Sequence, residues 1–169
     1  SVLLALGVGW LALENLRLRE RLDTVATDRD RLAREQVALT RDVESARQEL
    51  ERAVMAGRIV GAPQTRVVLL AGLGSIPEAS GHAYHDPGTR QAVFYASELP
   101  PLAADQDYQL WFIADGVPVS AGVFDPDEAG RGTLLVADVA APESIQAWAV
   151  TVEPAGGVPQ PTGEMVLKG

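Results

Sequence analysis

The stretch "YQLWFIADGVPVSAGVF", residues 108–124, decides the fold of the larger part of the chain. Between residues 108 and 114 apolar side chains occupy both alternating sets of positions, so both faces of this predicted strand are apolar. The turn residues "ADG" follow, and a second strand pattern extends over residues 117–124. We expect the first strand to lie centrally, in a core that it shares with Trp148, Val150 and Val152.

Six further runs of β-branched and aromatic residues surround this stretch, bounded by turns such as "HDPG", "ELPPL", "DPDEAGRG" and "EPAGG". No helical pattern lies between them, which favours an antiparallel sandwich or barrel over a parallel sheet. We assign residues 65–169 to a mainly β domain, an antiparallel β-sandwich, with Trp111, Trp148 and Phe124 in its core. The eight predicted strands are Thr65–Ala71, Ala83–His85, Gln91–Ala96, Tyr108–Ala114, Val117–Phe124, Gly132–Val136, Ile145–Val152 and Met165–Leu167.

Before this domain the hydrophobic period changes. Residues 11–54 contain neither proline nor glycine, and apolar residues recur every seven positions in two registers. This pattern predicts a long helix of coiled-coil type over residues 14–56, about 65 Å long from Leu11 to Val54 if fully helical. Its apolar seam is Leu18, Leu22, Val25, Leu32, Leu39, Val43 and Leu50.

The seam is interrupted by Arg29 and Gln36, two polar residues at a positions of the heptad. Such residues lower stability but favour a defined register and a small number of strands, so we expect a parallel homodimer. The alternative is a solvated single helix with ion pairs such as Asp30 with Arg34. Gly57, Gly61 and Pro63 predict that the helix ends in a hinge at residues 57–64.

The first thirteen residues, "SVLLALGVGWLAL", are apolar and begin without methionine, as if inside a longer chain. They would reach roughly 20 Å against a hydrocarbon core of about 30 Å. A signal-peptide core and a buried helix are alternatives. Trp10 and the arginines at positions 17, 19 and 21 resemble interfacial anchors, so we interpret residues 1–13 as the end of a transmembrane helix.

Composition excludes several classes of function. The formal net charge of -9 argues against nucleic-acid binding, because phosphates would be repelled. The chain has no cysteine, which excludes disulfides, thiol nucleophiles and zinc ribbons.

Three patterns resemble catalytic or metal sites and fail on inspection. Ser120 lacks the glycine two places earlier that a nucleophile elbow needs. "DPDEAG", residues 125–130, has Ala129 and Val136 where a calcium loop needs ligands at positions 5 and 12, and it better fits a hairpin turn. His82 and His85, beside Asp86, lie on opposite faces of a predicted strand. We therefore predict no catalytic residue, no metal, no cofactor and no enzymatic activity.

A glycine- and proline-rich segment near the end, "VTVEPAGGVPQPTG", covers residues 150–163. Its prolines remove the N–H donors that a phosphate loop needs, and their P-x-P spacing does not fit a polyproline ligand. We expect a stiff connection between two strands, in which Gly156 and Gly157 adopt positive φ and Glu153 accepts hydrogen bonds from the loop.

The stretch 108–124, the later block "AWAVTVEPAGGVPQPTGEMVLKG" at 147–169 and the preceding "ELPPL" resemble the C-terminal domain of the anti-sigma-K factor (RskA-like) family. The resemblance covers about the last 105 residues. The residues that carry it are Tyr108, Trp111, Gly122, Glu153, Pro154, Gly156, Gly157, Pro161, Thr162 and Gly163.

The resemblance implies a single-pass bacterial membrane protein whose cytoplasmic part holds an extracytoplasmic-function sigma factor inactive until proteolysis releases it. The β domain would lie outside the cytoplasm, and the sigma factor would be bound through a segment outside this sequence. The positive-inside rule alone would place the arginine flank in the cytoplasm; we follow the family. The alternative is an envelope protein that binds cell-wall polymer or a protein partner.

Overall fold

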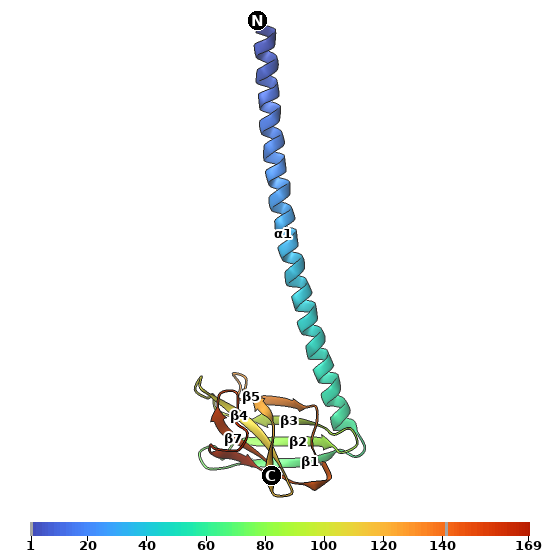
Figure 1. Cartoon of the computed structure of the whole chain (residues 1–169), viewed down its shortest axis with the longest axis vertical. Coiled ribbons are helices and arrows are strands. Elements are labelled where there is room, and N and C mark those ends of the chain that lie inside the picture. Colours follow the sequence, from blue (N-terminus) through green and yellow to red (C-terminus); the bar gives the residue numbers. More distant parts are fainter. Residues whose placement is uncertain (1, 141) are drawn as a thin grey trace. The chain divides into compact units, whose positions relative to one another are not determined.

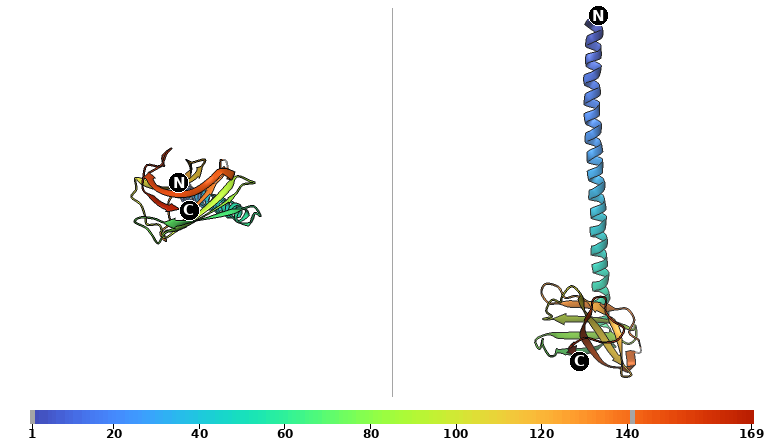
Figure 2. Two further views of the ribbon diagram at one scale, coloured as in Figure 1. Left: turned by 90° about the horizontal axis from the view of Figure 1, so that it is seen from below. Right: turned by 60° about the vertical axis from the view of Figure 1, so that its left-hand side comes forward.

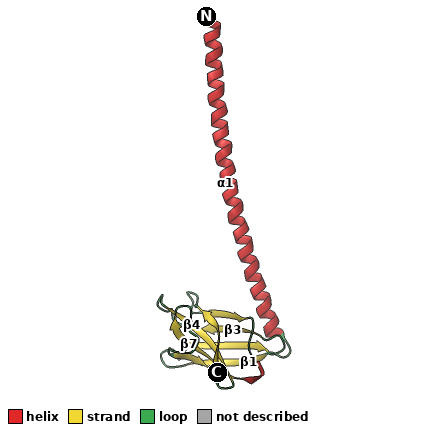
Figure 3. Ribbon diagram, in the orientation of Figure 1, coloured by secondary structure: helices red, strands yellow, loops and turns green. Residues whose placement is uncertain are grey.

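The computed structural model describes residues 2–140 and 142–169. They form one long helix followed by eight strands and a short 3₁₀ helix (Figure 1; Figure 3). The chain divides into two compact units, with the boundary between Leu50 and Glu51. Each unit is described by itself.

Helix α1 extends over Val2–Gly61 and confirms the predicted long N-terminal helix. Threonine hydroxyl groups bond to carbonyl groups one turn earlier, as Thr24 Oγ1 does to the Glu20 carbonyl at 2.8 Å. Of the predicted membrane segment 1–13, Ser1 lies outside the described residues. In the described part of α1 we find no stretch long and apolar enough to cross a membrane.

The end of α1 differs from the prediction, because the helix continues through Gly57 to Gly61 and the predicted hinge 57–64 begins inside it. Ala56 and Ile59 are buried against Val93 of the sheet, and this packing holds the last turn in helical form despite its glycines. The helix is then closed by the Ile59 carbonyl, which accepts bonds from the Ala62 N–H and the Thr65 hydroxyl.

The eight strands form one antiparallel sheet in the order β5-β4-β7-β8-β1-β2-β3-β6. The number of strands and the antiparallel pairing confirm the mainly β prediction. Their bounds are β1 Arg66–Gly72, β2 Ser80–Asp86, β3 Gln91–Ser97, β4 Gln106–Ala114, β5 Val117–Phe124, β6 Gly132–Val136, β7 Ile145–Pro154 and β8 Met165–Lys168, with the 3₁₀ helix η1 at Pro142–Ser144.

The sheet consists of two four-stranded halves that the β1–β8 pairing joins through two residue pairs, Ala71 with Lys168 and Gly72 with Leu167. The two halves lie opposite each other (Figure 2, left). At the far ends of the order, Gly122 of β5 lies against Leu134 of β6. The predicted sandwich of two sheets is therefore not confirmed, since one sheet curls until it is nearly closed.

The turn at residues 125–131 connects β5 and β6, which are not paired with each other, so it is not the predicted hairpin. Asp127 organises this turn. Its Oδ1 accepts bonds from the N–H groups of Ala129 and Arg131, both at 2.9 Å. Its carboxylate also pairs with the Arg131 guanidinium at 2.9 Å.

Strand β4 lies between β5 and β7, and every residue from Tyr108 to Phe112 is buried. One face packs into the main core with Trp148 and Val150, as expected. The other face carries Gln109 and Trp111, which are 2% and 1% exposed. Something must cover that second face, and residues 154–163 do so through the contacts described below.

Candidate functional site

The first candidate site is the apolar seam of α1, and in the described chain it has no partner. Its seven side chains are between 51% and 67% exposed. A large aliphatic side chain gains about 1.5–3 kcal/mol when it is fully buried. A helix with this stripe is stabilised most by a second surface that covers the stripe, because most helical stability comes from packing.

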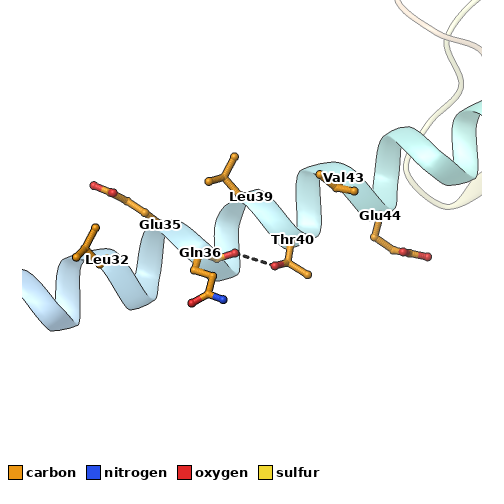
Figure 4. Close-up of a pocket in the computed structure, with 7 residues that line it drawn as sticks. All are labelled: Leu32, Glu35, Gln36, Leu39, Thr40, Val43 and Glu44. Atoms are coloured by element: carbon orange, nitrogen blue, oxygen red, sulfur yellow. Dashed lines mark hydrogen bonds between the residues drawn. The ribbon is translucent and has the colours of Figure 1, made fainter.

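Figure 4 shows the middle of the seam, where Leu32, Leu39 and Val43 project from the same side of the helix. A shallow surface pocket is lined by these three residues together with Gln36 and Glu35. The dashed line marks the bond from the Thr40 hydroxyl to the Gln36 carbonyl at 2.8 Å. This bond uses the backbone carbonyl of Gln36. The side-chain amide of Gln36 therefore remains available for hydrogen bonds with a partner at the centre of the seam.

The second candidate site is the hydrogen-bond network around Glu153, which is 1% exposed. The Thr151 hydroxyl donates to Glu153 Oε1 at 2.6 Å and accepts from Trp111 Nε1 at 2.9 Å. From the loop, the Thr162 hydroxyl donates to Oε2 at 2.6 Å, and its N–H donates to Oε1 at 3.0 Å. The Gly163 N–H reaches both oxygens at 3.1 Å. The predicted role of Glu153 as acceptor for the loop is confirmed.

These contacts decide the protonation of Glu153. Burial alone would raise the pKa of its carboxyl group, but the hydrogen bonds from Thr151, Thr162 and Gly163 outweigh burial and lower the pKa. The group is therefore a carboxylate at neutral pH with its acceptor sites filled. A fully satisfied, buried carboxylate fits a structural role rather than acid or base catalysis.

Two side chains of β4 fasten the same loop, which carries the resemblance residues Gly156 and Gly157. Gln109 bonds to Val158 twice, donating from Nε2 at 2.9 Å and accepting at Oε1 at 2.8 Å. Asp107 accepts from the Gly156 N–H at 2.7 Å. Gly156 and Gly157 have φ of 86° and 75°, as expected for this turn. Pro154 and Pro161 are exposed at the two ends of the loop.

The remaining resemblance residues are internal to the domain. Tyr108 is 1% exposed, and its hydroxyl donates to the Pro100 carbonyl at 2.9 Å, which attaches the "ELPPL" segment to β4. Gly122 occupies a bulge where the β4–β5 register shifts, with φ of 131°. The structure thus brings Trp111, Glu153, Thr162 and Gly163 into one hydrogen-bond network, whereas Gly122 pairs with Leu110 on the neighbouring strand.

The rejected catalytic and metal patterns have structural roles or none. Ser120 is exposed and accepts a bond from Gln109 Nε2 at 2.7 Å. His82 stacks on Tyr84, whereas His85 points into the core, so the two lie on opposite faces of β2. Among the residues that the structure describes, no three potential ligands of the His, Cys, Asp and Glu types lie close enough to hold a metal.

The environment of His85 is not evident from the sequence. This ring is 3% exposed and lies with its centroid 6.0 Å from that of Trp148. Within the described ranges neither ring nitrogen of His85, nor Nε1 of Trp148, has a hydrogen-bond partner. Burial lowers the pKa of His85, Arg66 lowers it further, and Glu143 and Asp86 partly oppose this. Only long-range packing of β1, β2 and β7 creates this site, so no local pattern indicates it.

We expect the stability of the β domain to fall as the pH is lowered below about 6.5. The unfolded chain binds a proton on His85 near that pH, whereas the folded chain resists protonation, so stability rises with pH across this window. The slope is at most about 1.4 kcal/mol per pH unit. Urea unfolding at pH 5 to 8 measures it.

His85→Phe should remove this slope, and His82→Gln, which changes the other histidine of the chain, serves as the control. A slope that survives in His85→Phe and disappears in His82→Gln would overturn the assignment.

A groove of about 590 Å³ lies within the second unit, between the end of α1 and strands β3 and β6. Its lining includes Arg52 and Ala53 of the helix, Tyr95 of β3, and Leu134 and Leu135 of β6. The sequence did not indicate this groove, because its walls come from segments about 40 residues apart.

Comparison with known proteins extends the resemblance from the β domain to the helix. The family model described as "Anti-sigma-K factor rskA, C-terminal" matches residues 1–165, rather than only the last 105 or so. A Streptomyces griseus protein, described as an uncharacterized protein in the phr 5' region, is 35% identical over 88 residues. Those residues are 52% of this chain and 36% of the relative, so the chain matches about a third of that protein's length. No solved structure was found to match the chain.

The long helix, strands β1 to β7 of the sheet and the loop fastened over β4 fall within the matched range. The chain therefore belongs to the anti-sigma-K factor family, of which it represents the C-terminal region.

Proposed function

We propose that this chain is the extracytoplasmic region of a single-pass membrane anti-sigma factor that controls an extracytoplasmic-function sigma factor. The observation that carries the proposal is the family match over residues 1–165, which covers the helix and nearly all of the β domain. The filled acceptor sites of Glu153 give this buried carboxylate a structural role within the domain.

The membrane attachment is proposed from the start of the chain. Residues 1–13 are apolar, and Trp10 is 65% exposed just before the first charged residues. Indole rings and arginines at such a boundary are typical of membrane–water interfaces. In this scheme the stalk at residues 14–56 carries the β domain away from the bilayer.

We propose two partners, a sigma factor and a second copy of this chain, which bind at different parts of the protein. The sigma factor is bound through a cytoplasmic segment outside this sequence, so none of the residues described above contacts it. A second copy of the chain covers the seam of α1 and forms a homodimer. A change in the association of the two stalks would then transmit a signal from the β domain to the part of the protein next to the membrane.

Membrane topology provides the first test. Alkaline phosphatase and green fluorescent protein are fused in turn after Gly169 of the full-length protein in its bacterial host. The proposal predicts active phosphatase and no fluorescence, because phosphatase matures outside the cytoplasm and the fluorophore forms inside. Fluorescence without phosphatase activity would place the β domain in the cytoplasm and contradict the proposal.

Transcription provides the second test. Deletion of the gene should raise a set of transcripts that share one promoter type, and the full-length protein should restore their level. If the transcript profile is unchanged while the fusions confirm the topology, the role in sigma-factor control is wrong. The alternative, an envelope protein without such a role, would then be favoured.

The two polar seam residues give a prediction about association. Replacing both Arg29 and Gln36 by leucine should tighten or alter the oligomer, because each change adds apolar surface at an a position and removes a polar layer. A tenfold or larger fall in the dissociation constant is expected, measured by sedimentation equilibrium in detergent.

Arg41→Leu with Gln48→Leu is the matched control, since it makes the same two replacements at f positions on the outer face of the helix. Equal behaviour of the two double variants would argue for the solvated single helix.

A further inference from the structure

The charges beside the seam differ between its two sides. On the g side five of six residues are charged acids, and on the e side the only charged residues are arginines. The g positions are Glu14, Arg21, Asp28, Glu35, Asp42 and Glu49; the e positions are Arg19, Ala26, Ala33, Thr40, Arg47 and Val54. Such an asymmetry is meaningful because e and g residues set partner choice and orientation in coiled coils.

A parallel pair of copies places each g residue opposite the e residue five positions later in the second copy. Two of these contacts join charged residues, and both are attractive. Glu14 faces Arg19 of the second copy, and Asp42 faces Arg47 of the second copy. No pair of like charges meets in this arrangement.

An antiparallel pair places g residues opposite g residues and e residues opposite e residues. In the antiparallel register that places Arg19 opposite Arg47, Asp28 would face Asp42 and Glu35 would face Glu35 of the second copy, whereas Glu49 would face Arg21. Like charges at such positions are destabilising, by amounts similar to the gain from opposite charges. The same charged residues therefore favour the parallel orientation and disfavour the antiparallel one.

The polar seam residues agree with a parallel, in-register pair. Arg29 is 86% exposed at its side chain and lies 3.8 Å from Asp30, so in one copy it has only a weak exposed ion pair. In a parallel dimer it lies next to Asp28 of the second copy, the g residue that precedes its counterpart. Gln36 meets Gln36, and their amides can exchange hydrogen bonds only when the two copies are in register.

We propose that residues 14–50 form a parallel, in-register, two-stranded coiled coil with a second copy of this chain, oriented by Glu14–Arg19 and Asp42–Arg47 contacts between copies. This inference rests on the proposed homodimer; to the parallel orientation expected from the sequence it adds the in-register alignment and the charged contacts between copies. It brings the two β domains to the same end of the stalk, as two copies anchored in one membrane would require.

Cysteine cross-linking tests the geometry, because the chain has no cysteine of its own. Leu39→Cys at the d position should form a disulfide dimer under mild oxidation, since facing d residues of a parallel pair meet. Ala38→Cys on the outer face is the control and should cross-link at least tenfold less. An equal mixture of Leu18→Cys and Leu50→Cys chains should give no mixed dimer, which only an antiparallel pair would produce.

Charge reversal tests the proposed contact. Asp42→Arg and Arg47→Asp should each weaken association by roughly three- to tenfold, and the double variant should recover most of the loss. The experiments are performed on the 169-residue chain in detergent. A stable dimer with mixed Leu18–Leu50 cross-links would overturn the parallel orientation alone, whereas a monomer at all concentrations would overturn the homodimer as well. Neither result depends on sigma-factor control, which the transcript profile tests separately.

Discussion

Glu153→Ala is expected to lower the free energy of unfolding of the β domain by about 3 kcal/mol. The change removes a buried acceptor and leaves the hydroxyl of Thr151 and the N–H groups of Thr162 and Gly163 without their partner. It also releases the loop that covers the second face of β4. Urea unfolding followed by tryptophan fluorescence measures the effect, since Trp111 belongs to the same network.

Glu164→Ala is the matched control. This neighbouring acid is exposed and accepts one long bond, from Ser75 at 3.4 Å, so its loss should change the unfolding free energy by less than about 0.5 kcal/mol. Two variants of equal stability would show that the Glu153 carboxylate is free for a partner rather than committed to the loop.

The same carboxylate predicts a second pH effect, at lower pH than that of His85. Because hydrogen bonds lower the folded-state pKa of Glu153, its contribution is complete above the usual range of a carboxyl group. The contribution is lost as the pH falls through the folded-state value. Glu153→Gln should flatten this acid limb of the stability curve and leave the limb near pH 6 unchanged.

Gly163→Ala is expected to have an effect of similar size, at least about 3 kcal/mol. A Cβ on Gly163 would lie 1.6 Å from the carbonyl oxygen of Val152 and 2.8 Å from its carbonyl carbon. These are backbone atoms of β7, so they cannot rotate away as a side chain could. The loop must shift, and the Gly163 N–H then leaves Glu153. Thermal unfolding by circular dichroism measures the loss.

Gly156→Ala distinguishes destabilisation by a steric clash from destabilisation by backbone strain. Gly156 has φ of 86°, but a Cβ added there would have no other atom within 4 Å, so alanine meets only the positive-φ penalty of about 1 kcal/mol. We expect Gly163→Ala to cost at least twice as much. The reverse order would mean that the turn geometry, and not the approach of the loop to β7, limits this segment.

Much of the domain could be predicted locally. The bounds of β5 and β6 are those expected, because short apolar runs between turn residues report strands directly. Strand β2 is longer than expected, at Ser80–Asp86, since it is defined by pairing with β3 over its whole length rather than by its own composition. Gly81 and His82 have low strand propensity, but their pairing with β3 keeps them in the strand.

The order of the strands could not be read from the chain. Strand β8 lies between β7 and β1, which brings the last strand beside the first and converts two expected sheets into one. The pairing of β1 with β8 involves residues almost 100 positions apart and leaves no local pattern. The helix end is similar, because Ile59 is held by Val93 and not by its neighbours in sequence.

Local sequence is enough to specify the long helix, its heptad seam with the flanking charges, the antiparallel strands and the turn that contains Gly156 and Gly157. Each of these depends on side chains within a few residues, where periodicity and backbone preference act. Contacts between distant segments are needed for the closure of the sheet, the burial of His85 beside Trp148, and the hydrogen bonds that fasten Thr162 and Gly163 to Glu153. Those features depend on which distant groups exclude water together, and burial makes a hydrogen bond or its absence decisive.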